Sequence, residues 1–398
     1  MIARSLLLFL LLTILPFLFF DLRFFRKKTA WWKRLLWWMP CAAMVAYTFH
    51  LASEPNFIPN NDRILILHLY LFILGLIIIP LWIYIICSFT GKGCSKVVRK
   101  MKRESSRPAR NYGNLVGLLG VLGVWFILFW GCFVGFNKLE VNHIEYVSRD
   151  LPAVFDGYRI VLFSDAHVGT LVGSRQWILQ RDIDSINAQH PDMIVFTGDL
   201  QNIQPQDLYP HLDVLSTLKA KDGVYAVLGN HDYAEYLGCD DAMKIANCRE
   251  TVSLERQMGW TLLLNEHRTI ERGQAHIVIA GMENDGDGEH FPQKGDIQKA
   301  LEGVTKDDFT LMLEHDPSSW RRRIIPDGRA QLTLSGHTHN MQFAVFGKSP
   351  LALTGREVNG WYQDGNQSLF VTTGMGGLIP FRFGATGEIV VLTLKCEK

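Results

Sequence analysis

The chain has 398 residues, 48% of them hydrophobic, and a formal net charge of +1. This length allows more than one domain, and a nearly neutral chain lacks the basic excess of nucleic-acid-binding proteins, so no nucleic-acid partner is expected. Apolar runs separated by basic clusters fill the first third of the chain, whereas the rest has the mixed composition of a soluble domain.

Four apolar runs occupy the first third, at residues 2–20, 35–51, 64–88 and 115–136. A helix needs roughly 20 apolar residues to cross a bilayer. The last two runs contain no charged residue, while the second is short and carries Pro40 and His50. No small-residue cleavage site follows the first run, which argues against a signal peptide. Residues 1–136 are therefore predicted to form a bundle of about four transmembrane helices.

One cluster of basic residues, at residues 23–34, precedes the second run, and another, at residues 92–110, follows the third run. The connection between these two runs, residues 53–63, holds a single basic residue. The positive-inside rule places both basic clusters in the cytoplasm. Because the fourth run leaves the second cluster, the rest of the chain is expected outside the cytoplasm. The sequence thus predicts a multi-pass protein of the plasma (inner) membrane with an extracytoplasmic domain and membrane lipids as partners.

Cysteines are consistent with that compartment without proving it. Cys239 and Cys248 lie close together in the outer part and could pair in an oxidising compartment. Their spacing would also suit two unpaired side chains on a helix, so both alternatives stay open.

A short connecting segment with strand character, residues 137–157, precedes the soluble domain of residues 158–398. Apolar strands are predicted at residues 159–163, ahead of Gly198 and ahead of Gly229, with helical stretches between them. The later part is richer in strands, at residues 262–264, 276–280, 309–313, 331–334, 369–372 and 388–394. This order indicates an α/β domain built as a β-sandwich flanked by helices.

Most of these strands end in side chains that bind metals. The residues concerned are Asp165, His167, Asp199, Asn230, His231, His315, His337 and His339. Open α/β architectures collect their sites at strand ends, where ligands far apart in sequence converge. Carboxylate, imidazole and amide oxygen together suit divalent Mn, Fe or Zn, and no thiolate joins the set.

The series DAH, GD, GNHD, a lone His and GHTH resembles the calcineurin-like metallophosphoesterase superfamily, in its membrane-anchored bacterial type, over about residues 159–394. Two departures are visible: "GDLQN" lacks a second acid that many members have, and "EHDP" has Asp316 where asparagine is common. Neither departure changes a ligand, so both bear on fine substrate preference only.

The resemblance implies two divalent metal ions. One would be held by Asp165, His167, Asp199 and His339, and the other by Asp199, Asn230, His315 and His337. Asp199 would bridge the ions, and a hydroxide between them would attack phosphorus. His231 would assist as a cation or proton donor, with Asp232 as a candidate for orienting it.

These features predict a membrane-anchored, metal-dependent phosphoester hydrolase. The short connecting segment favours a phosphorylated lipid or lipid-linked substrate, because tethering raises the local concentration of headgroups. The alternatives are hydrolysis of soluble extracytoplasmic phosphoesters and a non-catalytic, membrane-tethered metal-binding module. Arginines 321–323, 356 and 382 are expected in solvated basic patches, and the acidic stretch at residues 283–287 in a loop near the site.

Overall fold

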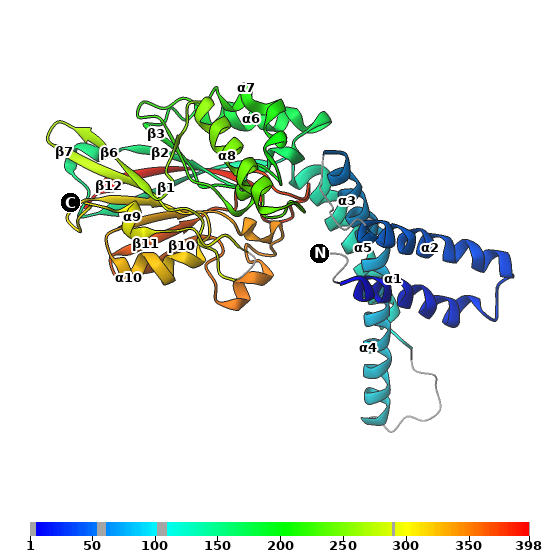
Figure 1. Cartoon of the computed structure of the whole chain (residues 1–398). Helices are drawn as coiled ribbons and strands as arrows, with labels where there is room; N and C mark the ends of the chain where they lie inside the picture. The colour runs from blue at the N-terminus through cyan, green and yellow to red at the C-terminus, as the bar shows by residue number, and fades with distance from the viewer. Residues whose placement is uncertain (1–4, 54–60, 102–109, 289–290, 398) are drawn as a thin grey trace. The chain divides into compact units, whose positions relative to one another are not determined.

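A computed structural model describes residues 5–53, 61–101, 110–288 and 291–397 of the chain. The chain folds as two compact units, Met1–Gly131 and Cys132–Lys398, and Figure 1 traces both from the blue N-terminus to the red C-terminus.

The first unit is entirely helical. Its helices are α1 (Leu6–Phe20), α2 (Trp31–Ser53), α3 (Asn61–Ile73), α4 (Ile79–Met101) and α5 (Gly113–Trp130). A π-helical turn, Leu74–Ile78, joins α3 and α4, so the described residues contain four stretches long and apolar enough to cross a membrane. Helix α4 runs on through Arg99, so part of the second basic cluster is helical rather than a loop. Lys102, Arg103 and Arg107 of that cluster lie outside the described residues.

The second unit contains two six-stranded mixed sheets. The first has the order β1-β12-β2-β3-β4-β5 and the second β10-β11-β9-β8-β7-β6. The strands of the first sheet are β1 (Leu139–Ser148), β2 (Arg159–Phe163), β3 (Met193–Phe196), β4 (Val224–Ala226), β5 (Thr261–Leu262) and β12 (Gly387–Cys396). Those of the second are β6 (Glu266–Arg272), β7 (Ala275–Gly281), β8 (Thr310–Leu313), β9 (Leu332–Ser335), β10 (Gly360–Asp364) and β11 (Gln367–Val371).

The two sheets pack face to face over an apolar core that includes Leu162 and Val195 from the first sheet and Leu311 and Leu334 from the second. Helices α6 (Gln176–Asn187), α7 (Leu212–Leu215) and α8 (Asp241–Gln257) lie along the first sheet, as Figure 1 shows. Short helices α9 (Ile297–Ala300) and α10 (Ile325–Asp327) lie along the second. Residues of the inner strands such as β2, β3, β8 and β9 are buried on both faces for this reason, which explains their continuous apolar runs.

The predicted fold class is confirmed: a helix-flanked β-sandwich in one unit and four long apolar helices in the other. Strands β6 and β10 and helix α8 were not predicted. Strands β6 and β10 are the outer strands of the second sheet, and their exposed side chains obscure an apolar pattern. Cys239 and Cys248 are both free thiols in the structure, so the possible disulfide is not formed.

Strand β1 falls within the segment expected to connect the domain. It pairs in parallel with β12 over ten residues, from Leu139 with Gly387 to Ser148 with Cys396. Just before it, Phe136 is buried in the core beneath the first sheet. The packing of the second unit therefore begins before its first strand.

Candidate metal centre

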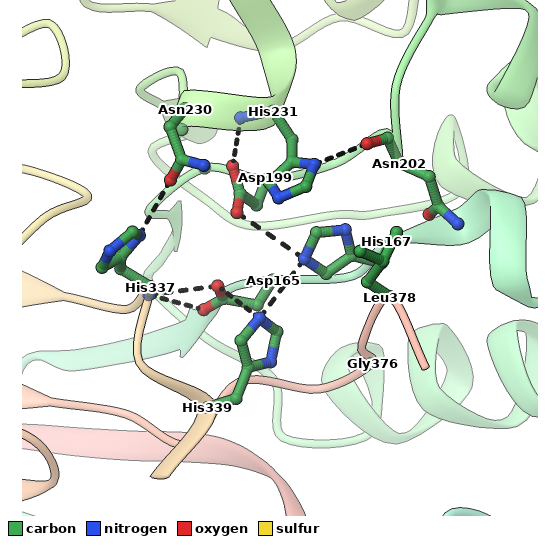
Figure 2. Close-up of polar contacts among 12 residues, drawn as sticks. Asp165, His167, Asp199, Asn202, Asn230, His231, His337, His339, Gly376 and Leu378 are labelled. Carbon is green, nitrogen blue, oxygen red and sulfur yellow. Dashed lines mark hydrogen bonds and ion pairs between the residues drawn. The ribbon is translucent and has the colours of Figure 1, made fainter. Parts of the chain in front are cut away.

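The metal-binding side chains follow the carboxyl ends of five parallel strands. In the first sheet these are β2, β3 and β4, and in the second sheet β8 and β9. The side chains gathered there are Asp165 and His167 after β2, Asp199 after β3, Asn230 and His231 after β4, His315 after β8, and His337 and His339 after β9. Figure 2 shows most of them pointing toward one another from separate elements.

A first group of ligand atoms comes from Asp165, His167, Asp199 and His339, whose atoms lie within 4.8 Å of one another. Nε2 of His167 is 3.3 Å from Nε2 of His339 and 3.6 Å from Oδ2 of Asp199. Nε2 of His339 is 3.3 Å from Oδ1 of Asp165. Ring nitrogens and carboxylate oxygens thus face a common point, which is how ligands surround a cation.

A second group consists of Asp199, His315 and His337, and the amide of Asn230 joins it. Oδ1 of Asn230 lies 3.1 Å from Nε2 of His315 and 2.8 Å from Nδ1 of His337. Nδ1 of His315 faces the carbonyl oxygen of Thr197 at 2.7 Å, which leaves Nε2 directed into the group.

One oxygen atom belongs to both groups. Oδ2 of Asp199 faces His167 on one side and, at 3.2 Å, Nε2 of His315 on the other. Its second oxygen, Oδ1, accepts the backbone N–H of His231 at 2.9 Å. The chain therefore holds the Asp199 carboxylate between the two groups.

Protonation of the histidines agrees with metal binding. Burial and the charge of His231 lower the pKa of His167 to about 3, and burial and the charge of His167 lower that of His339 well below its usual range. Both rings are neutral at pH 7, the form that binds metals. Burial alone would lower the pKa of His315, but the Asp199 carboxylate beside it raises the pKa to about 10. The donor set fits divalent metal ions.

His231 lies beside the two groups rather than in them. Nδ1 of its ring is 2.5 Å from the carbonyl oxygen of Asn202, so an Nδ1–H donor there leaves Nε2 as the other polar atom of the ring. The ring packs edge-on against His167, with centroids 4.8 Å apart, and lies tilted against the ring of Tyr236, with centroids 4.5 Å apart. These contacts fix the orientation of the imidazole.

Asp232, a candidate for orienting His231 or for a purely structural hydrogen bond, makes structural hydrogen bonds. Its buried carboxylate accepts four backbone N–H groups, from Asp199, Leu200, Gln201 and Gly229, at 2.8 to 3.2 Å. It thereby ties the turn after β3 to the turn after β4. Among the described contacts, the Asn202 carbonyl and not Asp232 orients the His231 ring.

Two supporting residues gave no signal in the sequence. Asn202 acts on His231 through its backbone, which any residue type supplies. Tyr236 receives a hydrogen bond from Nδ2 of Asn230 at 2.8 Å, which turns the amide oxygen of Asn230 toward the histidines. A tyrosine six residues after a ligand has no pattern of its own, so only the fold identifies it.

Two glycines are required by close packing of the turns. A Cβ on Gly336 would lie 2.1 Å from Oγ of Ser164 and 2.3 Å from Oδ2 of Asp165. A Cβ on Gly229 would lie 2.2 Å from Oδ1 of Asp199. Any side chain at these two positions would displace a ligand carboxylate.

The segment at residues 372–386, here called the closing loop, packs against the turn that carries Asp165. The backbone N–H of Met375 donates to the Ser164 carbonyl at 2.8 Å, and that of Gly376 to the Asp165 carbonyl at 2.9 Å. Figure 2 places Gly376 and Leu378 beside His167.

Arg382 holds the closing loop and is not in a solvated patch as expected. Its side chain is completely buried. The guanidinium donates to the carbonyls of Thr373, Gly374, Gly376 and Ala385. Burial lowers its pKa to about 10, so the group stays charged at neutral pH.

The arginines at 321–323 are also engaged rather than free. Arg322 and Arg323 pair with the buried carboxylate of Asp285 at 3.1 and 3.0 Å. The backbone N–H of Asp285 in turn donates to the Glu314 carboxylate, next to His315. The acidic stretch therefore supports the strand end that carries His315.

Comparison with known proteins agrees with this geometry. Residues 158–341 match the family model for calcineurin-like phosphoesterases. The "Transmembrane protein with metallophosphoesterase domain" of Danio rerio is 31% identical to this chain. The aligned part makes up 64% of this chain and 57% of that relative. The "Uncharacterized metallophosphoesterase YkuE" of Bacillus subtilis is 30% identical over 71% of this chain and is covered over 96% of its own length.

The match to the family model contains all seven candidate ligand residues, from Asp165 to His339. The chain belongs to the calcineurin-like metallophosphoesterase family.

Proposed function

We propose that the chain is a membrane-anchored phosphoester hydrolase that uses two divalent metal ions. The observation that carries the proposal is the carboxylate of Asp199, whose single Oδ2 atom faces both ligand groups. Two cations held by groups that share one ligand lie close together and repel each other, and the negative charge of the shared ligand offsets that repulsion. When bound, the ions supply positive charge against the negative charge that develops at phosphorus and make water more acidic.

His231 supplies the proton in this proposal. When water attacks phosphorus and the ester P–O bond breaks, the leaving oxygen needs a proton or a nearby positive charge. The ring of His231 keeps Nδ1 on the Asn202 carbonyl, so Nε2 is the atom that can give that proton. Asp232 keeps the two ligand turns together and does not touch the substrate.

Space for a substrate lies next to the second ligand group. A pocket of about 480 Å³ opens beside His337 and is lined by Phe291, Asp316, Arg322 and Arg356, among others. Its mixture of basic, aromatic and polar side chains suits a phosphoester that carries an organic group. Monoesters and diesters both fit this chemistry.

We further propose an extracytoplasmic domain in the plasma (inner) membrane and a phosphorylated lipid or lipid-linked substrate. The relative from Danio rerio carries the word "transmembrane" in its name, and the apolar helices of this chain support an anchor. Only five residues separate the end of α5 at Trp130 from Phe136 in the core of the second unit, so a long flexible tether is absent from this described stretch.

The test is hydrolysis of p-nitrophenyl phosphate and its bis ester by the full chain in detergent. Activity that disappears with EDTA and returns with Mn²⁺ is expected. A folded, metal-loaded chain that hydrolyses neither ester would support the non-catalytic alternative. Turnover of phosphatidic acid in mixed micelles, compared with the soluble esters, separates a lipid substrate from a soluble one.

A further inference from the structure

A loop with exposed apolar side chains follows the last ligand, His339. This segment, residues 341–355, is here called the docking loop. Phe346 is fully exposed, Leu353 is 89% exposed, and the side chains of Met341 and Val345 are about half exposed. Single exposed apolar residues are ordinary, but several in one segment mark a surface that contacts something else.

Hydrogen bonds fix the docking loop to the closing loop. The side-chain amide of Gln342 donates to the carbonyls of Ile379 and Phe381, both at 2.9 Å. The backbone N–H of Ala344 donates to the carbonyl of Phe383 at 2.8 Å. Ile379 is itself exposed and extends the apolar surface. The two loops therefore form one surface beside the metal centre.

The closing loop leads directly into β12, which starts beside the first residue of β1. Gly387, at the start of β12, pairs with Leu139, the first residue of β1. A Cβ on Gly387 would lie 2.5 Å from the carbonyl oxygen of Met375 and 3.4 Å from that of Lys138. Met375 of the closing loop and Lys138 therefore both lie close to Gly387, and the last apolar span ends at Gly135, three residues before Lys138.

We propose that the docking loop inserts into the surface of the lipid bilayer and so brings the metal centre to lipid-borne phosphoesters. This inference rests on the proposed function. Only three residues lie between Gly135, the last residue of the span, and Leu139, the first residue of β1. Moving the exposed side chains of Phe346 and Leu353 from water into the acyl boundary is favourable, because it removes apolar surface from water.

Charges around the docking loop fit a lipid surface. Lys348 is exposed two residues after Phe346. Arg356 is largely exposed, with a loose 3.7 Å ion pair to Asp287. Apolar side chains flanked by basic residues are the pattern of segments that lie at the interface of anionic membranes. The lipid surface is therefore favoured over a protein partner.

Fluorescence quenching tests the proposal directly. The full chain, with the exposed Cys94 replaced by Ser, carries an environment-sensitive label at Val345→Cys and is reconstituted in phosphatidylcholine–phosphatidylglycerol vesicles. Lipids brominated near the headgroup should quench this label. The control is the same label at Val147→Cys. Val147 is also exposed, but it lies near the far end of β1, about 25 Å along the strand from Leu139.

Three outcomes decide the matter. Quenching at position 345 and not at 147 supports insertion, and equally weak quenching at both overturns it. Quenching that grows with protein density in the vesicles would instead indicate contact between copies and would also overturn it. Hydrolysis of p-nitrophenyl phosphate by the labelled chain reports the proposed function separately, because a soluble ester does not need the membrane.

A functional arm uses the double variant Phe346→Ser/Leu353→Ser against Val147→Ser. Turnover of phosphatidic acid in vesicles should fall about tenfold or more in the double variant, since 1.4 kcal/mol of lost interaction corresponds to tenfold. Turnover of p-nitrophenyl phosphate should stay unchanged in both variants. A double variant that keeps full lipid turnover would contradict the proposal.

Discussion

At the scale of single residues, the ligands share an uncommon backbone conformation. Asp165, His167, Asp199, His337 and His339 all have positive φ, between 43° and 74°. This left-handed region costs a residue with a side chain roughly 1–2 kcal/mol, and such strain gathers at functional sites. Surrounding contacts maintain it: the backbone N–H of His337, for example, donates to both oxygens of Asp165.

Asp199→Ala should remove the carboxylate shared by both ligand groups. The metal content of the purified chain should then fall well below that of the unaltered chain, with activity lost. Metal analysis by mass spectrometry checks this, and Asp184→Ala, on the exposed side of α6, is the control. A variant that kept its metals and most of its turnover would refute the ligand assignment.

His231→Asn separates metal binding from proton transfer. Because His231 stands outside both ligand groups, the variant should keep its metals. Its rate should fall by about 10²–10⁴-fold, the usual cost of a lost general acid. Parallel metal analysis and kinetics test this. A loss of metal equal to that of Asp199→Ala would identify His231 as a ligand instead.

Glu255 predicts a pH dependence of stability. Its buried carboxylate oxygens have no hydrogen-bond partner in the described part of the chain. Burial, and then the charge of Asp232, raises the pKa of this carboxyl well above its usual range. The folded state therefore binds a proton that the unfolded state releases above its ordinary pKa of 4.5. Stability falls as the pH rises from that value through the raised pKa.

Glu255→Gln removes this titration. The Tm of the variant relative to the unaltered chain should rise between pH 5 and pH 8, by about 2–4 °C for each kcal/mol recovered. Thermal unfolding of the full chain over that range measures the difference, so effects common to both chains cancel. Glu302→Gln, at an exposed position, should show no such trend. If the Tm difference between the variant and the unaltered chain were the same at every pH, Glu255 would be excluded as the source of a pH dependence of stability.

At the scale of elements, the closing loop connects the chain's last strand to the metal centre. Arg382→Lys should lower the Tm, because one ammonium cannot replace a guanidinium that donates to four carbonyls, and each orphaned buried acceptor costs about 1–3 kcal/mol. Metal content should also fall, since the loop backs the Asp165 turn. Arg356→Lys, at an exposed position, is the control. Unchanged Tm and metal content would show that Arg382 does not position the loop.

At the scale of the whole molecule, the basic clusters determine the expected topology. A reporter fused after Lys398 should behave as extracytoplasmic. Cys94 is exposed in the structure, and its labelling in intact cells should require a permeabilised membrane, because its cluster is expected on the cytoplasmic side. Labelling without permeabilisation, together with an active cytoplasmic reporter at the C-terminus, would reverse the orientation.

The sequence by itself predicted the class of the domain, the apolar spans and the residues that the fold gathers into two candidate ligand groups. These follow from local patterns: apolar runs of fixed length, and polar residues such as Asp165 and His337 directly after strands. The outer strand β10 and helix α8 were not predicted, because the spacing of apolar residues is a weak signal in an element that exposes one face.

Only the tertiary structure decided which groups hold the ligands in place. Asn202 orients His231 through a backbone carbonyl, and backbone groups are the same in every residue. Asp232 and Arg382 bind backbone groups that only the folded turns bring together. The resemblance already implied that Asp199 is shared, and the structure adds the physical reason: its Oδ2 faces both ligand groups because two sheets meet at one edge.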